Sequence, residues 1–106
     1  MVVSLIYITC KNADEAAAIG RILVAEKHVA CANILPDTTA IFEWDGAICS
    51  ESEAVLLLKT ATDVVATVTE RVKALHSYDL PCVIALPVTG GNQTFLDWVE
   101  THSRQT

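Results

Sequence analysis

Residues 29–59 read VACANILPDTTAIFEWDGAICSESEAVLLLK, and this stretch decides the fold. Asp45-Gly46 separates two apolar, β-prone runs, which predicts a hairpin with a two-residue turn. Each arm is about twice the usual strand length of roughly 5–6 residues. Pro36 cannot donate to a ladder, so it predicts a bend or bulge in the first arm. A hairpin this long overhangs a small domain and leaves edges that need a partner. Another copy of the chain is the simplest partner, so we expect an oligomer with its functional site between subunits.

The sequence on either side of the hairpin predicts the other elements from hydrophobic periodicity and capping signals. They are a strand over 2–9, a helix over 12–28, a helix from 62 to 76, a strand over 83–88 and a short helix that Asn92 caps. The order is βαββαβ plus a C-terminal helix. It predicts an α+β fold of the ferredoxin-like split βαβ type, with both main helices on one face of an antiparallel sheet. The polar tail from Thr101 is predicted to fray.

Composition limits the classes of function. The 106 residues predict a single domain over 1–106. The chain is 52% hydrophobic with a net charge of −6, which fits an apolar subunit interface and argues against a nucleic-acid partner. No apolar run approaches the roughly 18 residues of a membrane span, and the N-terminal run lacks the basic segment of a signal peptide. We therefore expect no membrane association and a cytoplasmic location.

The candidate metal ligands are Cys10 at the end of the first strand and His76 at the end of the second main helix. A thiolate and an imidazole suit copper or zinc. Structural roles are the alternatives, because a free cysteine packs as a small hydrophobe and a histidine cation suits a helix C-terminus. The motifs of common nucleophilic, metal-hydrolytic and nucleotide-dependent enzymes are absent from the sequence, so we expect no enzymatic activity.

Four further residues are candidates for lining a ligand cleft. Trp44 and Tyr78 are large aromatics beside turns, where a pocket or packing at a subunit boundary would explain them equally well. Glu53 and Lys59 lie six residues apart on one arm of the hairpin. An even separation places both on one face of a strand, as an ion pair or as part of a ligand cradle.

Taken together, five motifs resemble the CutA family, the divalent-cation tolerance proteins. They are ACANILP at 30–36, FEWDG at 42–46, LLKT at 57–60, HSYDLP at 76–81 and IALPV at 84–88. The resemblance covers nearly the whole chain, in order and at similar spacing.

The resemblance implies a cytoplasmic, PII-like homotrimer of ferredoxin-like subunits that binds divalent metals such as copper and has no established enzymatic reaction. It also implies a metal site with a Cys at the end of the first strand and two adjacent His at the end of the second helix. Cys10 and His76 match this pattern, whereas Leu75 stands where the first His would be. The first functional hypothesis is therefore a homotrimer that binds copper, or another divalent cation such as zinc, in metal tolerance. The alternative is a PII-like regulatory or scaffold trimer that binds a small anion or metabolite at a subunit cleft formed by Trp44, Glu53, Lys59 and Tyr78.

Overall fold

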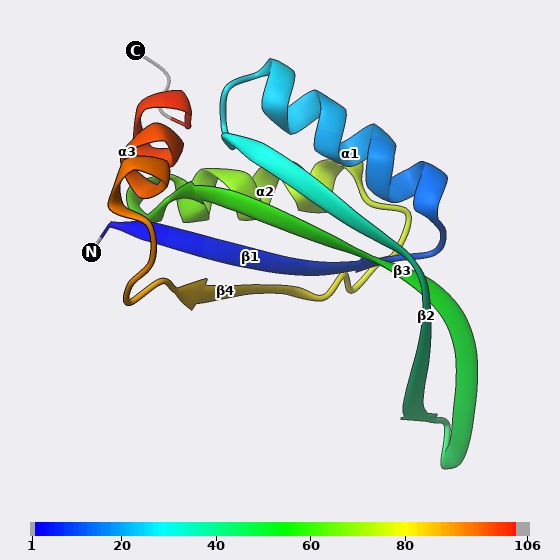
Figure 1. The fold of residues 1–106 in the computed structure, drawn as a ribbon. Coiled ribbons are helices and arrows are strands. Elements are labelled where there is room, and N and C mark those ends of the chain that lie inside the picture. The colour runs from blue at the N-terminus through cyan, green and yellow to red at the C-terminus, as the bar shows by residue number, and fades with distance from the viewer. Residues whose placement is uncertain (1, 104–106) are drawn as a thin grey trace.

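The protein, in a computed structural model that describes residues 2–103, forms one antiparallel sheet with two long helices on the same face (Figure 1). In chain order the elements are β1 (Val3–Cys10), α1 (Ala13–Ala25), β2 (Cys31–Trp44), β3 (Ala47–Ala61), the 3-10 turn η1 (Thr62–Val64), α2 (Val65–Leu75), β4 (Val83–Pro87) and α3 (Gln93–His102). The strand order is β2-β3-β1-β4. This confirms the predicted α+β fold of the split βαβ type, with a C-terminal helix added.

The β2–β3 hairpin has the predicted turn and length. Asp45 and Gly46 have φ values of 55° and 80°, and two positive φ angles in a two-residue turn match the twist of the strands. The arms contain 14 and 15 residues. The register shifts between Leu35 and Thr38, so the bulge falls at Pro36 as predicted. The far half of the hairpin bends away from the body of the subunit (Figure 1).

The core lies between the sheet and the two long helices. Side chains that alternate along β1 and β3 meet the apolar faces of α1 and α2, as period-two strands and period-3.6 helices require. The fully buried large residues here are Ile6, Ile8, Leu23, Val29, Leu56, Leu58, Val68 and Val72. Within residues 2–103, no helix is long and apolar enough to cross a membrane.

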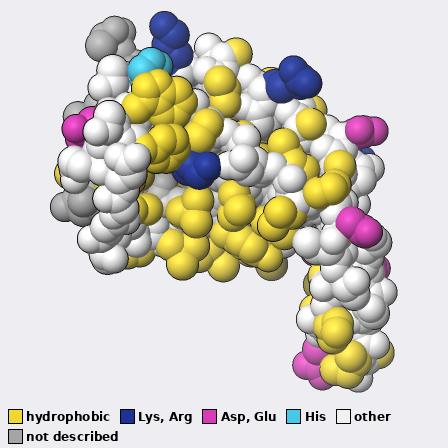
Figure 2. All heavy atoms as spheres, in the orientation of Figure 1, with side chains coloured by type: hydrophobic (Ala, Val, Ile, Leu, Met, Phe, Trp, Pro, Cys, Tyr) yellow, Lys and Arg dark blue, Asp and Glu magenta, His cyan; other side chains and the backbone are white. Residues whose placement is uncertain are grey.

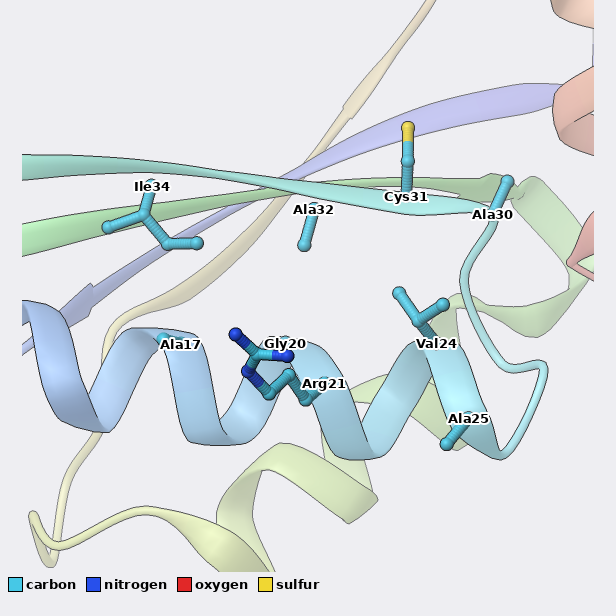
Figure 3. A pocket seen from close by; sticks show the side chains of 9 residues that line it. All are labelled: Ala17, Gly20, Arg21, Val24, Ala25, Ala30, Cys31, Ala32 and Ile34. Atoms are coloured by element: carbon cyan, nitrogen blue, oxygen red, sulfur yellow. The ribbon is translucent and has the colours of Figure 1, made fainter.

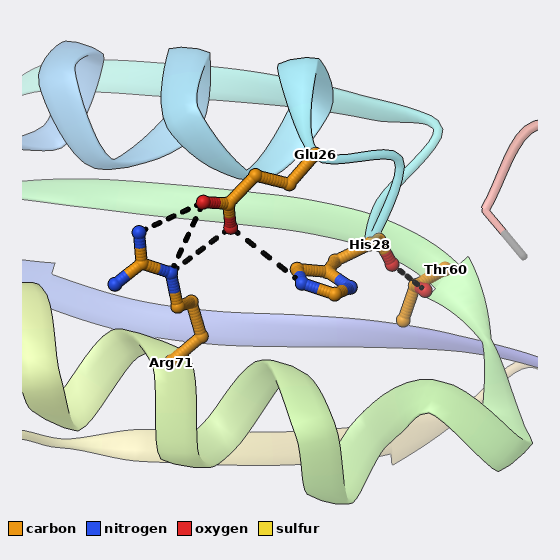
Figure 4. A network of polar contacts seen from close by, with 4 residues as sticks. All are labelled: Glu26, His28, Thr60 and Arg71. Carbon is orange, nitrogen blue, oxygen red and sulfur yellow. Dashed lines mark hydrogen bonds and ion pairs between the residues drawn. The ribbon is translucent and has the colours of Figure 1, made fainter. Parts of the chain in front are cut away.

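The C-terminal end of α1 is held by backbone and side-chain contacts. Lys27 adopts a left-handed φ of 62°, and the His28 N–H donates to the Leu23 carbonyl, which closes the helix. The Glu26 carboxylate accepts two-pronged hydrogen bonds from Arg71 on α2 (Figure 4). Hydrogen bonding from Arg71 lowers the pKa of Glu26. The contact joins the C-terminal end of α1 to α2.

The prediction of a frayed tail from Thr101 was wrong for its first residues. Helix α3 continues to His102, and Ser103 is buried. The Ser103 hydroxyl donates to the Val99 carbonyl and accepts from the Ala61 N–H at 2.9 Å. This link attaches the end of α3 to the end of β3. The rest of the predicted tail, 104–106, lies outside the described residues.

Candidate metal centre and adjoining cleft

Cys10, Glu15 and His76 come together at one end of the sheet. Cys10 ends β1, Glu15 lies in the first turn of α1, and His76 follows α2. One potential ligand atom from each residue lies within 4.8 Å of the other two. The structure therefore places the two predicted ligands side by side and adds Glu15. The sequence analysis took Glu15 only as the partner of the Asn12 cap. Its place five residues after Cys10, across a tight strand-to-helix turn, is the signal that could have identified it.

The Cys10 thiol is fully buried and neutral near pH 7. Burial raises its pKa to about 12, and the negative charges of Glu15 and Glu53 add to the effect. A metal ion at this sulfur must therefore displace a proton, since the thiolate is the ligand form. An ion of charge +2 offsets the unfavourable charges that keep the thiol protonated.

Both ring nitrogens of His76 are hydrogen-bonded. The Tyr78 N–H donates to Nδ1 at 3.0 Å, and Nε2 lies 2.8 Å from the carbonyl oxygen of Thr9. A backbone N–H can only donate and a carbonyl can only accept, so these partners assign the proton to Nε2. His76 is thus oriented by its neighbours, and a metal ion must replace one of these two hydrogen bonds.

Glu15 supplies the charge of the cluster. Burial opposes its ionisation, but hydrogen bonds from Ser77 and from the Lys11 N–H outweigh burial and lower its pKa, with a smaller contribution from His76. The backbone N–H groups of Lys11 and Ser77 donate at 3.0 and 2.9 Å. A thiolate, an imidazole and a carboxylate form a mixed donor set that fits copper or zinc. The residues present therefore fit the metal that the sequence analysis expected.

A cleft of about 620 Å³ opens beside this cluster. Three of the four predicted cleft residues, Trp44, Glu53 and Tyr78, line it, so the structure brings these three together. The Tyr78 hydroxyl donates to Glu53 at 2.7 Å, and burial together with this bond raises the pKa of Tyr78. The other residues that line the cleft are Thr9, Ala40, Ile41, Phe42, Asp79, Leu80 and Cys82.

Lys59 does not belong to the cleft. Its ammonium donates to Asn33 and lies 5.8 Å from the centre of the Phe95 ring. Among the described residues no ion pair joins Lys59 to Glu53. Six residues of strand correspond to about 20 Å at roughly 3.3 Å per residue. Within one subunit the structure therefore does not bring Glu53 and Lys59 together, because a shared face is not a shared site.

A second hollow, of about 550 Å³, lies between α1 and β2 (Figure 3). Mostly small apolar side chains border it, together with Arg21, and Cys31 points away from α1. None of the six predicted site residues borders this hollow. This hollow is therefore separate from the metal-ligand cluster and from the cleft beside it.

Comparison with known proteins agrees with this description. Residues 4–102 match the family model described as CutA1 divalent ion tolerance protein. The chain is 40% identical over 98 residues to the divalent-cation tolerance protein CutA of Thermus thermophilus, covering 92% of this chain and 95% of that protein. It is 39% identical over 99 residues to the chloroplastic CutA protein of Arabidopsis thaliana, covering 93% of this chain but 54% of that protein. The chain thus spans about half the length of some curated relatives that it matches.

Solved structures give the same result. The crystal structure of CutA from Xylella fastidiosa superposes with a TM-score of 0.95 at 36% identity, covering 98% of this chain and all of that one. CutA1 from Thermus thermophilus gives a TM-score of 0.92 at 38% identity, covering 96% and 99% of the two chains. The fold, the length of the match and the sequence identity agree. The chain therefore belongs to the CutA1 divalent ion tolerance protein family.

Proposed function

We propose that this chain is a non-enzymatic homotrimer that binds a divalent cation, copper in the first place, through Cys10, Glu15 and His76. The observation that carries the proposal is the convergence of three different donor atoms within 4.8 Å of one another. The names of its Thermus and Archaeoglobus relatives, divalent-cation tolerance protein, support the same class of ligand.

The donor set favours copper over the other divalent first-row metals. Affinity at nitrogen, oxygen and sulfur ligands rises to a maximum at copper, and a thiolate adds a soft ligand. Zinc is the next candidate, because a thiolate, an imidazole and a carboxylate are all established zinc ligands. The bound ion would supply positive charge to a buried site that already holds the Glu15 carboxylate.

The residues of the chain act in three ways. Cys10 gives up its proton, so binding is coupled to proton release. His76 exchanges its hydrogen bond with Tyr78 or Thr9 for the ion. Glu15 stays fixed by the Lys11 and Ser77 N–H groups and balances part of the charge. The three side chains are thus held in position before the ion binds, and binding depends on release of the Cys10 proton.

The protonated state of Cys10 also supports a non-enzymatic role. A nucleophilic cysteine needs a lowered pKa, whereas burial raises that of Cys10 to about 12. His76 lies beside Cys10, but both of its ring nitrogens are held by hydrogen bonds to Thr9 and Tyr78. A protonated, buried Cys10 beside a hydrogen-bonded His76 is therefore better suited to metal binding than to catalysis.

Exposed apolar surface supports the homotrimer. Ile41 and Ile48 near the hairpin tip are 74% and 76% exposed. The register places them on the same face of the hairpin, because Ile41 pairs with Ser50 and Ile48 with Glu43. Figure 2 shows further apolar side chains gathered over the side of the body near β4. Edges and apolar faces of this kind are normally covered by a partner.

The test is calorimetric titration of the reduced protein with copper and with zinc under inert gas. We expect one ion per subunit for the native protein, and at least about tenfold weaker binding for Cys10→Ser, Glu15→Gln and His76→Gln. Cys49→Ser and His102→Gln are the matched controls, because they remove a thiol and an imidazole outside the cluster. An equal loss of metal affinity in the two control variants, or no loss in the three cluster variants, would contradict the proposed site.

A further inference from the structure

We propose that the cleft beside the metal centre is a binding site for a small organic cation, a quaternary ammonium or alkylamine. This ligand is separate from the metal ion and opposite in charge to the small anion that the sequence analysis considered. The inference rests on the side chains that line the cleft between the hairpin and the loop after α2.

The charge of the cleft is acidic. Among residues 2–103, Glu53 and Asp79 are the charged residues that line it, and no lysine or arginine does so. Lys59, the cation that would have served an anionic ligand, instead contacts Asn33 and Phe95. The other described lining residues are aromatic, aliphatic, threonine or cysteine side chains, so the two carboxylates set the charge of the cleft. An anion would meet only repulsion here, whereas a cation would find two counter-ions.

Aromatic side chains define the chemical class further. Phe42, Trp44 and Tyr78 all line the cleft, and Trp44 is 68% exposed. The face of an aromatic ring attracts a cation, most strongly for tryptophan, and aromatic side chains are the usual surroundings of a bound quaternary ammonium. The cleft volume of about 620 Å³ falls within the range of small-molecule sites, about 300–1,000 Å³.

The test uses the native assembly, freed of metal by a chelator. In a Trp98→Phe background Trp44 is the single tryptophan, because the chain has two. The fluorescence of Trp44 is measured while choline is added and, in a separate titration, while 3,3-dimethylbutanol is added. The second compound is an uncharged molecule of the same shape as choline. We expect saturable binding of choline and none of the isostere at equal concentration. Glu53→Gln should weaken choline binding by about tenfold, in line with loss of a desolvated charge contact.

Glu43→Gln is the matched control, because Glu43 lies on the same hairpin but does not line the cleft. It should leave choline binding unchanged. Equal binding of the isostere, tighter binding of inorganic phosphate, or no saturable binding of choline would each overturn the proposal. If circular dichroism shows that the Glu53→Gln variant does not fold, Asp79→Asn tests the same charge effect at an exposed position. Because the protein is metal-free, this result stands apart from the outcome of the copper titration.

Discussion

The Cys10 thiol determines how metal binding should depend on pH. Its pKa of about 12 lies above the neutral range, so the free protein holds this proton throughout that range. Each bound ion displaces one proton, and the apparent affinity should therefore rise about tenfold per pH unit on going from mildly acidic to mildly alkaline solution. Competition with a chelator of known affinity at several pH values measures this slope. A pH-independent affinity would mean that Cys10 is not a ligand, and the Cys10→Ser variant should show the shallower slope.

Ser103 offers a separate test at the residue scale. Its buried hydroxyl accepts from the Ala61 N–H and donates to the Val99 carbonyl. Ser103→Ala leaves the Ala61 N–H without that partner, so we expect the free energy of unfolding to fall by about 1–3 kcal/mol. Urea denaturation measures the loss. Thr67→Ala, which removes an exposed hydroxyl from α2, is the control and should cost far less.

Individual site residues were predictable from the sequence to different degrees. Cys10 and His76 were predicted from their residue types and their match to a family motif, and the structure places them close together. Glu15 was missed because its capping role gave a sufficient local explanation. Within one subunit Lys59 lies apart from Glu53, because alternation along a strand fixes the face of a side chain but not its distance from another. Local sequence patterns thus predict the face on which a side chain lies. Only the tertiary structure shows which side chains lie close together.

At the scale of elements, Gly20 sets how closely α1 packs on β2. A β-carbon placed on Gly20 would lie 3.1 Å from the β-carbon of Ala32. Gly20→Val should therefore force the helix from the sheet and lower the free energy of unfolding by about 1–3 kcal/mol. Thermal or urea unfolding gives the value. Ala18→Val adds the same branched group at an exposed position of α1 and is the control. Valine is a better helix former than glycine and a poorer one than alanine, so a loss at Gly20 no larger than the loss at Ala18 would contradict the packing argument.

The elements themselves were largely predictable, because each had a strong local signal. Asp45-Gly46 specified the hairpin turn, Pro36 the bulge and Asn12 the start of α1. The end of α3 was not predictable in the same way. The residues from Thr101 are polar, and the burial of Ser103 depends on a hydrogen bond to β3, 42 positions earlier in the chain.

At the scale of the whole molecule, the hairpin tip should control assembly. Ile41 and Ile48 form an exposed apolar face, and burying a charge there would oppose association. We expect the Ile41→Lys, Ile48→Lys double variant to shift the protein from the proposed trimer towards monomer, as measured by sedimentation velocity. Val24→Lys, on the helical side, is the matched control, since it also adds a lysine at an exposed apolar position. An unchanged trimer in the double variant would place the interface elsewhere, and a native protein that sediments as a monomer would contradict the proposed assembly.

The most direct test of the central proposal is X-ray absorption spectroscopy of the copper-loaded protein. Cys10, Glu15 and His76 predict a first coordination shell with one sulfur, together with nitrogen and oxygen ligands that include an imidazole. The sulfur contribution should disappear in Cys10→Ser and remain in Cys49→Ser. A shell of nitrogen and oxygen alone in the native protein would contradict the account.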